Sequence, residues 1–193
     1  MATSRQNLKS IIEAMLFVAD RPIGLKKFIQ LLPEYDRYSI ITTLEIIQRE
    51  YRDGKCGFEL KEVAGGFRFQ TCRSLRSWVL RLKRSSPVRL SKAALETLAL
   101  VAYRQPITRA EIESVRGVDT SGTLHFLLDR NIIRIVGRKD LPGRPLLYGT
   151  TRHFLEVFEL KDLSDLPSLA EMAGPERRTN GPPQIPLFRQ VRG

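Results

Sequence analysis

Apolar residues recur along this chain at helical and strand spacings, and one order of spacings occurs twice. Lys9 to Ala19 reads KSIIEAMLFVA, and Lys92 to Ala102 reads KAALETLALVA, with Lys, Glu, Val and Ala in register. After a slip of one residue, Arg21-Pro22-Ile23 aligns with Gln105-Pro106-Ile107. An internal repeat of this kind predicts two copies of one small structural module.

Polar residues mark the helix boundaries of the second copy. The expected caps are Ser91, Thr108 and Asp119 at helix N-termini, with Gly117 and Asn131 at left-handed helix ends and Glu111 completing a capping box with Thr108. We therefore expect helices over residues 92–103, 109–116 and 120–130, strands over 132–136 and 146–148, and a closing helix over 151–159. Three helices followed by a β-hairpin is the winged-helix plan.

The first copy repeats this plan. We expect helices over residues 8–19, 25–32 and 36–52, and a hairpin of strands 57–63 and 67–71 across Gly65-Gly66. A further amphipathic helix is expected over 73–84, with Leu75, Trp78, Val79 and Leu82 on one face. Ser85-Ser86-Pro87 then separates the copies.

The fold class expected from these patterns is α+β and mostly helical, with tandem winged helix-turn-helix domains and a disordered C-terminal tail. The domains are expected at residues 1–86 and 87–170. Residues 171–193 form the expected tail, because the chain there is rich in Pro and Arg and has no apolar periodicity.

Composition favours a folded protein that binds acidic partners. The chain is 42% hydrophobic and 27% charged, and its formal net charge is +11. Such charge suits nucleic acid, an anionic membrane surface or an acidic protein, without choosing among them. We expect a soluble, cytoplasmic protein with reduced Cys56 and Cys72, since residues 11–19 are too few to span a bilayer and no signal peptide is evident.

Catalysis finds no support in the motifs. The chain contains no phosphate loop, nucleophile elbow or His-Glu-x-x-His, and His125 is expected on the solvated side of its helix. Cys56 and Cys72 alone cannot complete a structural zinc site. Glu13 and Glu96, each the lone acid of an apolar helix, are expected to have structural partners. We therefore expect no enzymatic activity, catalytic residue, cofactor or metal.

DNA recognition is the alternative reading, as a winged-helix transcription regulator. The third helix of this plan ordinarily enters the major groove, yet residues 119–130 and 36–53 each carry one more acid than base. Positive charge gathers elsewhere, including the second wing. The candidate residues for non-specific DNA contact are Arg73, Arg76, Arg81, Lys83 and Arg84, and a solvated basic face explains them equally well.

Protein binding fits the pattern best. Residues 11–19 are apolar almost all round, which is typical of a helix covered on every side, and a domain of this size has little depth to cover it. We expect a homodimer through the first domain. The candidate interface residues are Ile11, Ile12, Met15, Leu16 and Phe17.

Several long segments closely resemble one family, segregation and condensation protein B. They are LSKAALETLALVAYRQPITRAEIESVRGVD at residues 90–119, IVGRKDLPGRPLLYGTT at 135–151 and LKDLSDLPSL at 160–169, with looser likeness at 11–23 and 57–71. The family is the partner of the kleisin in the structural-maintenance-of-chromosomes (SMC) condensin complex of bacteria. The resemblance implies a non-enzymatic dimer that clamps the kleisin, meets the SMC ATPase through it, and reaches chromosomal DNA mostly indirectly during chromosome condensation and partition, in the cytoplasm at the nucleoid.

Two further surfaces are candidates for binding. The rigid wing tip and nearby aromatic side chains of the second domain suggest a kleisin contact, through Arg138, Pro142, Arg144, Tyr148, Phe154 and Phe158. The alternative is that Phe154 and Phe158 close the domain's own core. In the tail, Gln184, Leu187 and Phe188 are similar to a peptide that docks on the bacterial sliding clamp, unless this segment folds back on its own domain.

Overall fold

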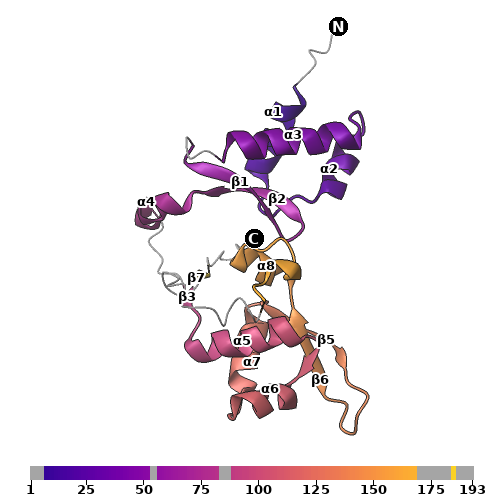
Figure 1. Cartoon of the computed structure of the whole chain (residues 1–193), viewed down its shortest axis with the longest axis vertical. Helices are drawn as coiled ribbons and strands as arrows, with labels where there is room; N and C mark the ends of the chain where they lie inside the picture. The colour runs from indigo at the N-terminus through magenta and orange to yellow at the C-terminus, as the bar shows by residue number, and fades with distance from the viewer. Residues whose placement is uncertain (1–6, 53–55, 83–87, 169–183, 186–193) are drawn as a thin grey trace, which may run out of the picture. The chain divides into compact units, whose positions relative to one another are not determined.

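The computed structural model describes residues 7–52, 56–82, 88–168 and 184–185, drawn as ribbon in Figure 1. The chain divides into two compact units, Met1–Ser86 and Pro87–Gly193. Each described unit combines helices with a small antiparallel sheet.

The first unit packs three helices against a hairpin. Its elements are α1 (Leu8–Val18), α2 (Leu25–Leu31), α3 (Arg37–Glu50), β1 (Phe58–Val63), β2 (Gly66–Thr71), the 3-10 turn η1 (Arg73–Leu75) and α4 (Arg76–Leu82). Asp36 caps α3, since its carboxylate accepts a hydrogen bond from the Ser39 amide at 2.6 Å. The core consists of Ile12, Leu16, Phe28, Leu32, Ile40, Leu44, Ile47 and Leu60.

The hairpin turn of this unit lies one residue earlier than expected. Ala64 and Gly65 take the left-handed conformation, with φ of 52° and 68°, whereas Gly66 already belongs to β2. Gly66 serves a close approach instead, because a Cβ built there would lie 2.8 Å from the carbonyl carbon of Ile23. This proximity allows Ile23 and Phe67 to exchange two backbone hydrogen bonds of 2.9 Å.

The second unit has the same plan. Its elements are β3 (Val88–Arg89), α5 (Lys92–Arg104), β4 (Ile107–Thr108), α6 (Arg109–Arg116), α7 (Ser121–Asp129), β5 (Ile133–Arg138), β6 (Leu146–Thr150), α8 (Arg152–Phe158), the 3-10 turn η2 (Leu163–Asp165) and β7 (Gln184–Ile185). The wing forms an antiparallel sheet in the order β4-β6-β5. Ile107 pairs with Tyr148 as Ile23 pairs with Phe67, so the repeat seen in the sequence is a repeat of structure.

Most of the expected caps of this unit are confirmed. Ser91 caps α5, Thr108 and Glu111 form the capping box of α6, and Gly117 ends α6 at a φ of 70°. The prediction for Asp119 is wrong, because Thr120 is the N-cap of α7 and Asp119 accepts a hydrogen bond from the Ser121 amide at 2.6 Å. With its three helices and wing in each unit, the expected tandem winged-helix fold is confirmed.

Most of the expected tail lies outside the described residues. Gln184 and Ile185 are described, and they pair antiparallel with Arg89 and Val88. Among the helices that the structure describes, none has the length and apolar character needed to cross a membrane.

Candidate interaction surfaces

The α1 helix divides the expected dimer residues between its two faces. Ile12 and Leu16 are only 0% and 2% exposed, because they pack into the core of their own unit. Both are therefore corrected from interface to core residues. Ile11 and Met15 are half-buried at the edge of this core, and Phe17 is 84% exposed.

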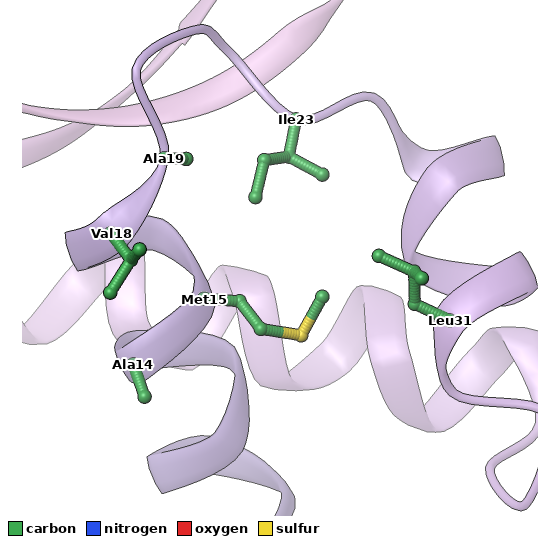
Figure 2. Close-up of a pocket in the computed structure, with 6 residues that line it drawn as sticks. All are labelled: Ala14, Met15, Val18, Ala19, Ile23 and Leu31. Carbon is green, nitrogen blue, oxygen red and sulfur yellow. The ribbon is translucent and has the colours of Figure 1, made fainter.

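The outer face of α1 borders an apolar groove. The groove has a volume of about 450 Å³ and is lined by Ala14, Met15, Val18, Ala19, Ile23 and Leu31. Figure 2 shows the Met15 side chain reaching from α1 toward Leu31, with Ile23 between the two helices. Val18 is 78% exposed and Leu31 48% exposed, so the groove opens to the surface. Exposed apolar surface of this kind is typical of a docking site.

The wing of the second unit keeps only part of its expected binding face. Tyr148 and Phe154 are buried in the unit's own core, at 7% and 2% exposure, so their assignment to kleisin contact is wrong. Phe158 is half-buried beside Phe154, with ring centroids 4.8 Å apart. The alternative assigned these two rings to core packing, and the structure agrees with it.

The wing tip itself remains accessible. Arg138, Pro142 and Arg144 are exposed, and Arg138 Nη1 donates a hydrogen bond to the Arg144 carbonyl oxygen at 3.1 Å. Ile135, Val136 and Leu141 add exposed apolar surface to the same hairpin. The wing thus offers both guanidinium groups and apolar side chains to a partner.

An ion pair joins the wing to α6, and sequence reasoning missed it. Lys139 Nζ lies 2.6 Å from Glu111 Oε1, while Glu111 Oε2 accepts hydrogen bonds from the Thr108 amide and hydroxyl. The Lys139 ammonium, followed by the Thr108 donors, lowers the pKa of Glu111 to about 2. No local pattern marks this pair, since the two residues meet only when the hairpin folds beside α6.

The basic belt lies on η1 and α4 as far as it is described. Arg73, Arg76 and Arg81 are exposed there, whereas Lys83 and Arg84 lie outside the described residues. The Arg81 guanidinium stacks 4.3 Å from the ring centroid of Trp78, which is itself 62% exposed.

The histidine, cysteine and glutamate side chains that were considered for catalysis or metal binding have ordinary structural neighbours. The His125 side chain is 79% exposed and lies 3.8 Å from Asp129, while the Cys72 thiol donates to the Cys56 carbonyl oxygen. Glu13 accepts a hydrogen bond from the Tyr51 hydroxyl at 3.2 Å. Glu96 pairs with Arg116, which confirms the expected structural partner. Within the described residues, no group of three or more metal-ligating side chains comes together.

Of the three tail residues suggested for the sliding-clamp contact, the structure describes one. Gln184 belongs to β7, beside β3, whereas Leu187 and Phe188 lie outside the described residues. The suggested clamp contact therefore stays a prediction from the sequence.

The fold and its exposed surfaces define a tandem winged-helix protein of the α+β class. Residues 10–169 match the family model described as segregation and condensation complex subunit ScpB, and the chain belongs to this family. The resemblance seen in the sequence is thereby confirmed.

Two relatives agree with the family match in sequence. The chain is 50% identical over 164 residues to segregation and condensation protein B of Syntrophotalea carbinolica, which covers 85% of this chain and 83% of the relative. It is 42% identical over 186 residues to the protein of that name from Moorella thermoacetica, covering 93% of each. The chain is 32% identical in sequence to ScpB from Mycobacterium tuberculosis, whose crystal structure aligns with a TM-score of 0.38. This alignment covers 81% of this chain and 97% of that one.

Proposed function

We propose that this chain is a non-enzymatic subunit of the segregation and condensation complex, which dimerises through its first unit and clamps the kleisin. The kleisin links it to the SMC ATPase, so that contact with chromosomal DNA is mostly indirect, in the cytoplasm at the nucleoid. Membership of the ScpB family supports the complex. The proposed dimer is supported by the apolar outer face of α1, where Phe17 and Val18 are 84% and 78% exposed.

The dimer is tested on the purified full-length chain by size-exclusion chromatography with light scattering. Phe17→Asp and Val18→Asp should each halve the mass at micromolar concentration, because a carboxylate buried in an apolar interface lacks a partner. Val118→Asp is the matched control, since Val118 is a 54% exposed apolar residue of the second unit. A wild-type chain that is monomeric at these concentrations would contradict the proposal.

The kleisin contact is proposed at the wing tip, through Arg138, Pro142 and Arg144 beside the exposed Leu141. Arg144→Glu should weaken co-purification with the co-expressed kleisin by tenfold or more, since it reverses the charge of an exposed anchor. Arg104→Glu changes an exposed arginine at the end of α5 and serves as the control. Equal kleisin recovery from both variants would remove the wing from the footprint.

A further inference from the structure

The short helix α4 presents an apolar stripe outside the core of the first unit. Trp78, Val79 and Leu82 of α4 follow the spacing i, i+1 and i+4 and share one side of the helix, and Leu75, the last residue of the preceding turn η1, continues the apolar surface. Their exposure is unusual, at 37% for Leu75, 62% for Trp78 and 86% for Leu82. Anchors at this spacing are how an amphipathic helix enters an apolar groove of a partner.

The same unit contains a groove suited to such a helix. Ala14 and Ala19 contribute short side chains, and Met15 lies across the groove toward Leu31. The flexible thioether of Met15 can adapt to an inserted side chain. Helix and groove are therefore two apolar surfaces of one chain, both open to solvent in the single copy.

A copy cannot fill its own groove with its own α4. Ile23, which lines the groove, pairs with Phe67 near the turn of the hairpin. Thr71, the last residue of β2, lies four residues beyond Phe67, which is about 13 Å along the strand. The helix α4 begins only after Thr71. Figure 1 shows α4 past the open end of the hairpin, on the side of the unit away from α2. The groove and the helix can therefore meet only between two copies.

We propose that in the dimer the α4 helix of each copy packs Trp78 and Leu82 into the α1–α2 groove of the other copy. This inference rests on the proposed dimer and names the element that occupies its interface. The exchange is mutual, so one two-fold axis buries two helices in two grooves and the assembly closes.

Trp78 makes the contact measurable, because it is the only tryptophan of the chain. The full-length protein is diluted through its dimer dissociation while light scattering reports mass and fluorescence reports Trp78. We expect the emission to shift to longer wavelength, and acrylamide quenching to increase, in step with the loss of dimer. If the Trp78 emission does not change as the mass falls, the inference is wrong. The same result is expected if the second unit of the same copy covers Trp78, because dissociation of the dimer would then leave Trp78 covered.

Substitutions on the two surfaces should act alike. Val18→Asp in the groove and Leu82→Asp on the helix should each raise the dimer dissociation constant at least tenfold and expose Trp78, whereas Val118→Asp should do neither. Circular dichroism checks folding, and Leu82→Ser replaces Leu82→Asp if that variant fails this check. A Leu82 variant that leaves the dimer intact would overturn the inference.

A mixing experiment separates this inference from the proposed dimer. Val18→Asp and Leu82→Lys variants should each be monomeric, yet form a heterodimer when mixed, because one contact is then native and the other pairs opposite charges. If Val18→Asp dissociates the dimer without changing Trp78 emission, the groove is an interface but α4 does not occupy it. If the wild-type chain is a monomer throughout, the proposed dimer and this inference both fail.

Discussion

At the scale of single residues, two glycines with opposite surroundings should respond oppositely to one added methyl group. A Cβ on Gly66 would meet the carbonyl carbon and oxygen of Ile23 at 2.8 and 3.0 Å, and backbone atoms cannot swing aside. We expect Gly66→Ala to destabilise the first unit by about 1–3 kcal/mol, the usual cost of overpacking. Gly122 lies in α7 with open space around it, so Gly122→Ala should stabilise the second unit by about 0.5–1 kcal/mol.

Native-state hydrogen exchange measures both effects in the full chain, since it reports the protection of each unit separately. The amides of β2 should exchange faster in Gly66→Ala, and those of α7 more slowly in Gly122→Ala. Unchanged protection of β2 would show that the Ile23 backbone yields more easily than its close approach implies.

Residue roles that depend on neighbours in the chain were predictable, and those that depend on distant packing were not. Ser91 and the Thr108–Glu111 capping box act within one helical turn, so the sequence alone identified them. Tyr148 was expected at the surface, and Phe154 either there or in the core, because the burial of both depends on which elements close over them. An aromatic side chain looks the same in a sequence whether it anchors a partner or a core.

At the scale of elements, the ion pair between α6 and the wing predicts a specific response to acid. The pKa of Glu111 falls from 4.5 to about 2 in the folded unit, so the folded state favours its carboxylate. The resulting stabilisation is fully present above about pH 4.5 and is lost as the pH falls toward 2. We expect Glu111→Gln to reduce this pH dependence while it keeps an N3 residue able to complete the capping box.

The measurement is the protection of α6 amides against hydrogen exchange between pH 5 and 2.5, corrected for intrinsic rates. Lys139→Gln should give an intermediate response, because Lys139 is the largest cause of the lowered pKa and the Thr108 donors remain. Identical pH dependence of the wild type and Glu111→Gln would show that this carboxylate does not couple α6 to acid.

Element boundaries were predictable to within a few residues, whereas the partners of their apolar faces were not. The spacing of Trp78 and Leu82 correctly indicated an amphipathic helix at α4. Amphipathicity shows that a face needs covering, yet it does not say by what. The sequence therefore identified the stripe, and only the structure shows that the core of its own unit leaves it open.

At the scale of the whole molecule, the charge of +11 is distributed away from the helices that would read DNA. In α3, Arg37 and Arg49 are balanced by Glu45 and Glu50, and α7 carries Asp129 without a lysine or arginine. The belt of Arg73, Arg76 and Arg81 instead lies on η1 and α4. This distribution favours contact with phosphates over contact with base edges.

We therefore expect the full chain to bind duplex DNA weakly and without sequence preference. We expect this binding to disappear as salt is added. The slope of log K against log salt should flatten by about 0.9 for each belt arginine that contacts a phosphate when Arg73, Arg76 and Arg81 are changed to Gln. Arg37→Gln, Arg49→Gln and Arg104→Gln together remove the same charge elsewhere and should change the slope less. Fluorescence anisotropy with two unrelated duplexes at several salt concentrations measures the sequence preference and the salt slope of each variant. Tight, salt-resistant binding to one duplex, sensitive to the α3 substitutions, would instead indicate a winged-helix transcription regulator.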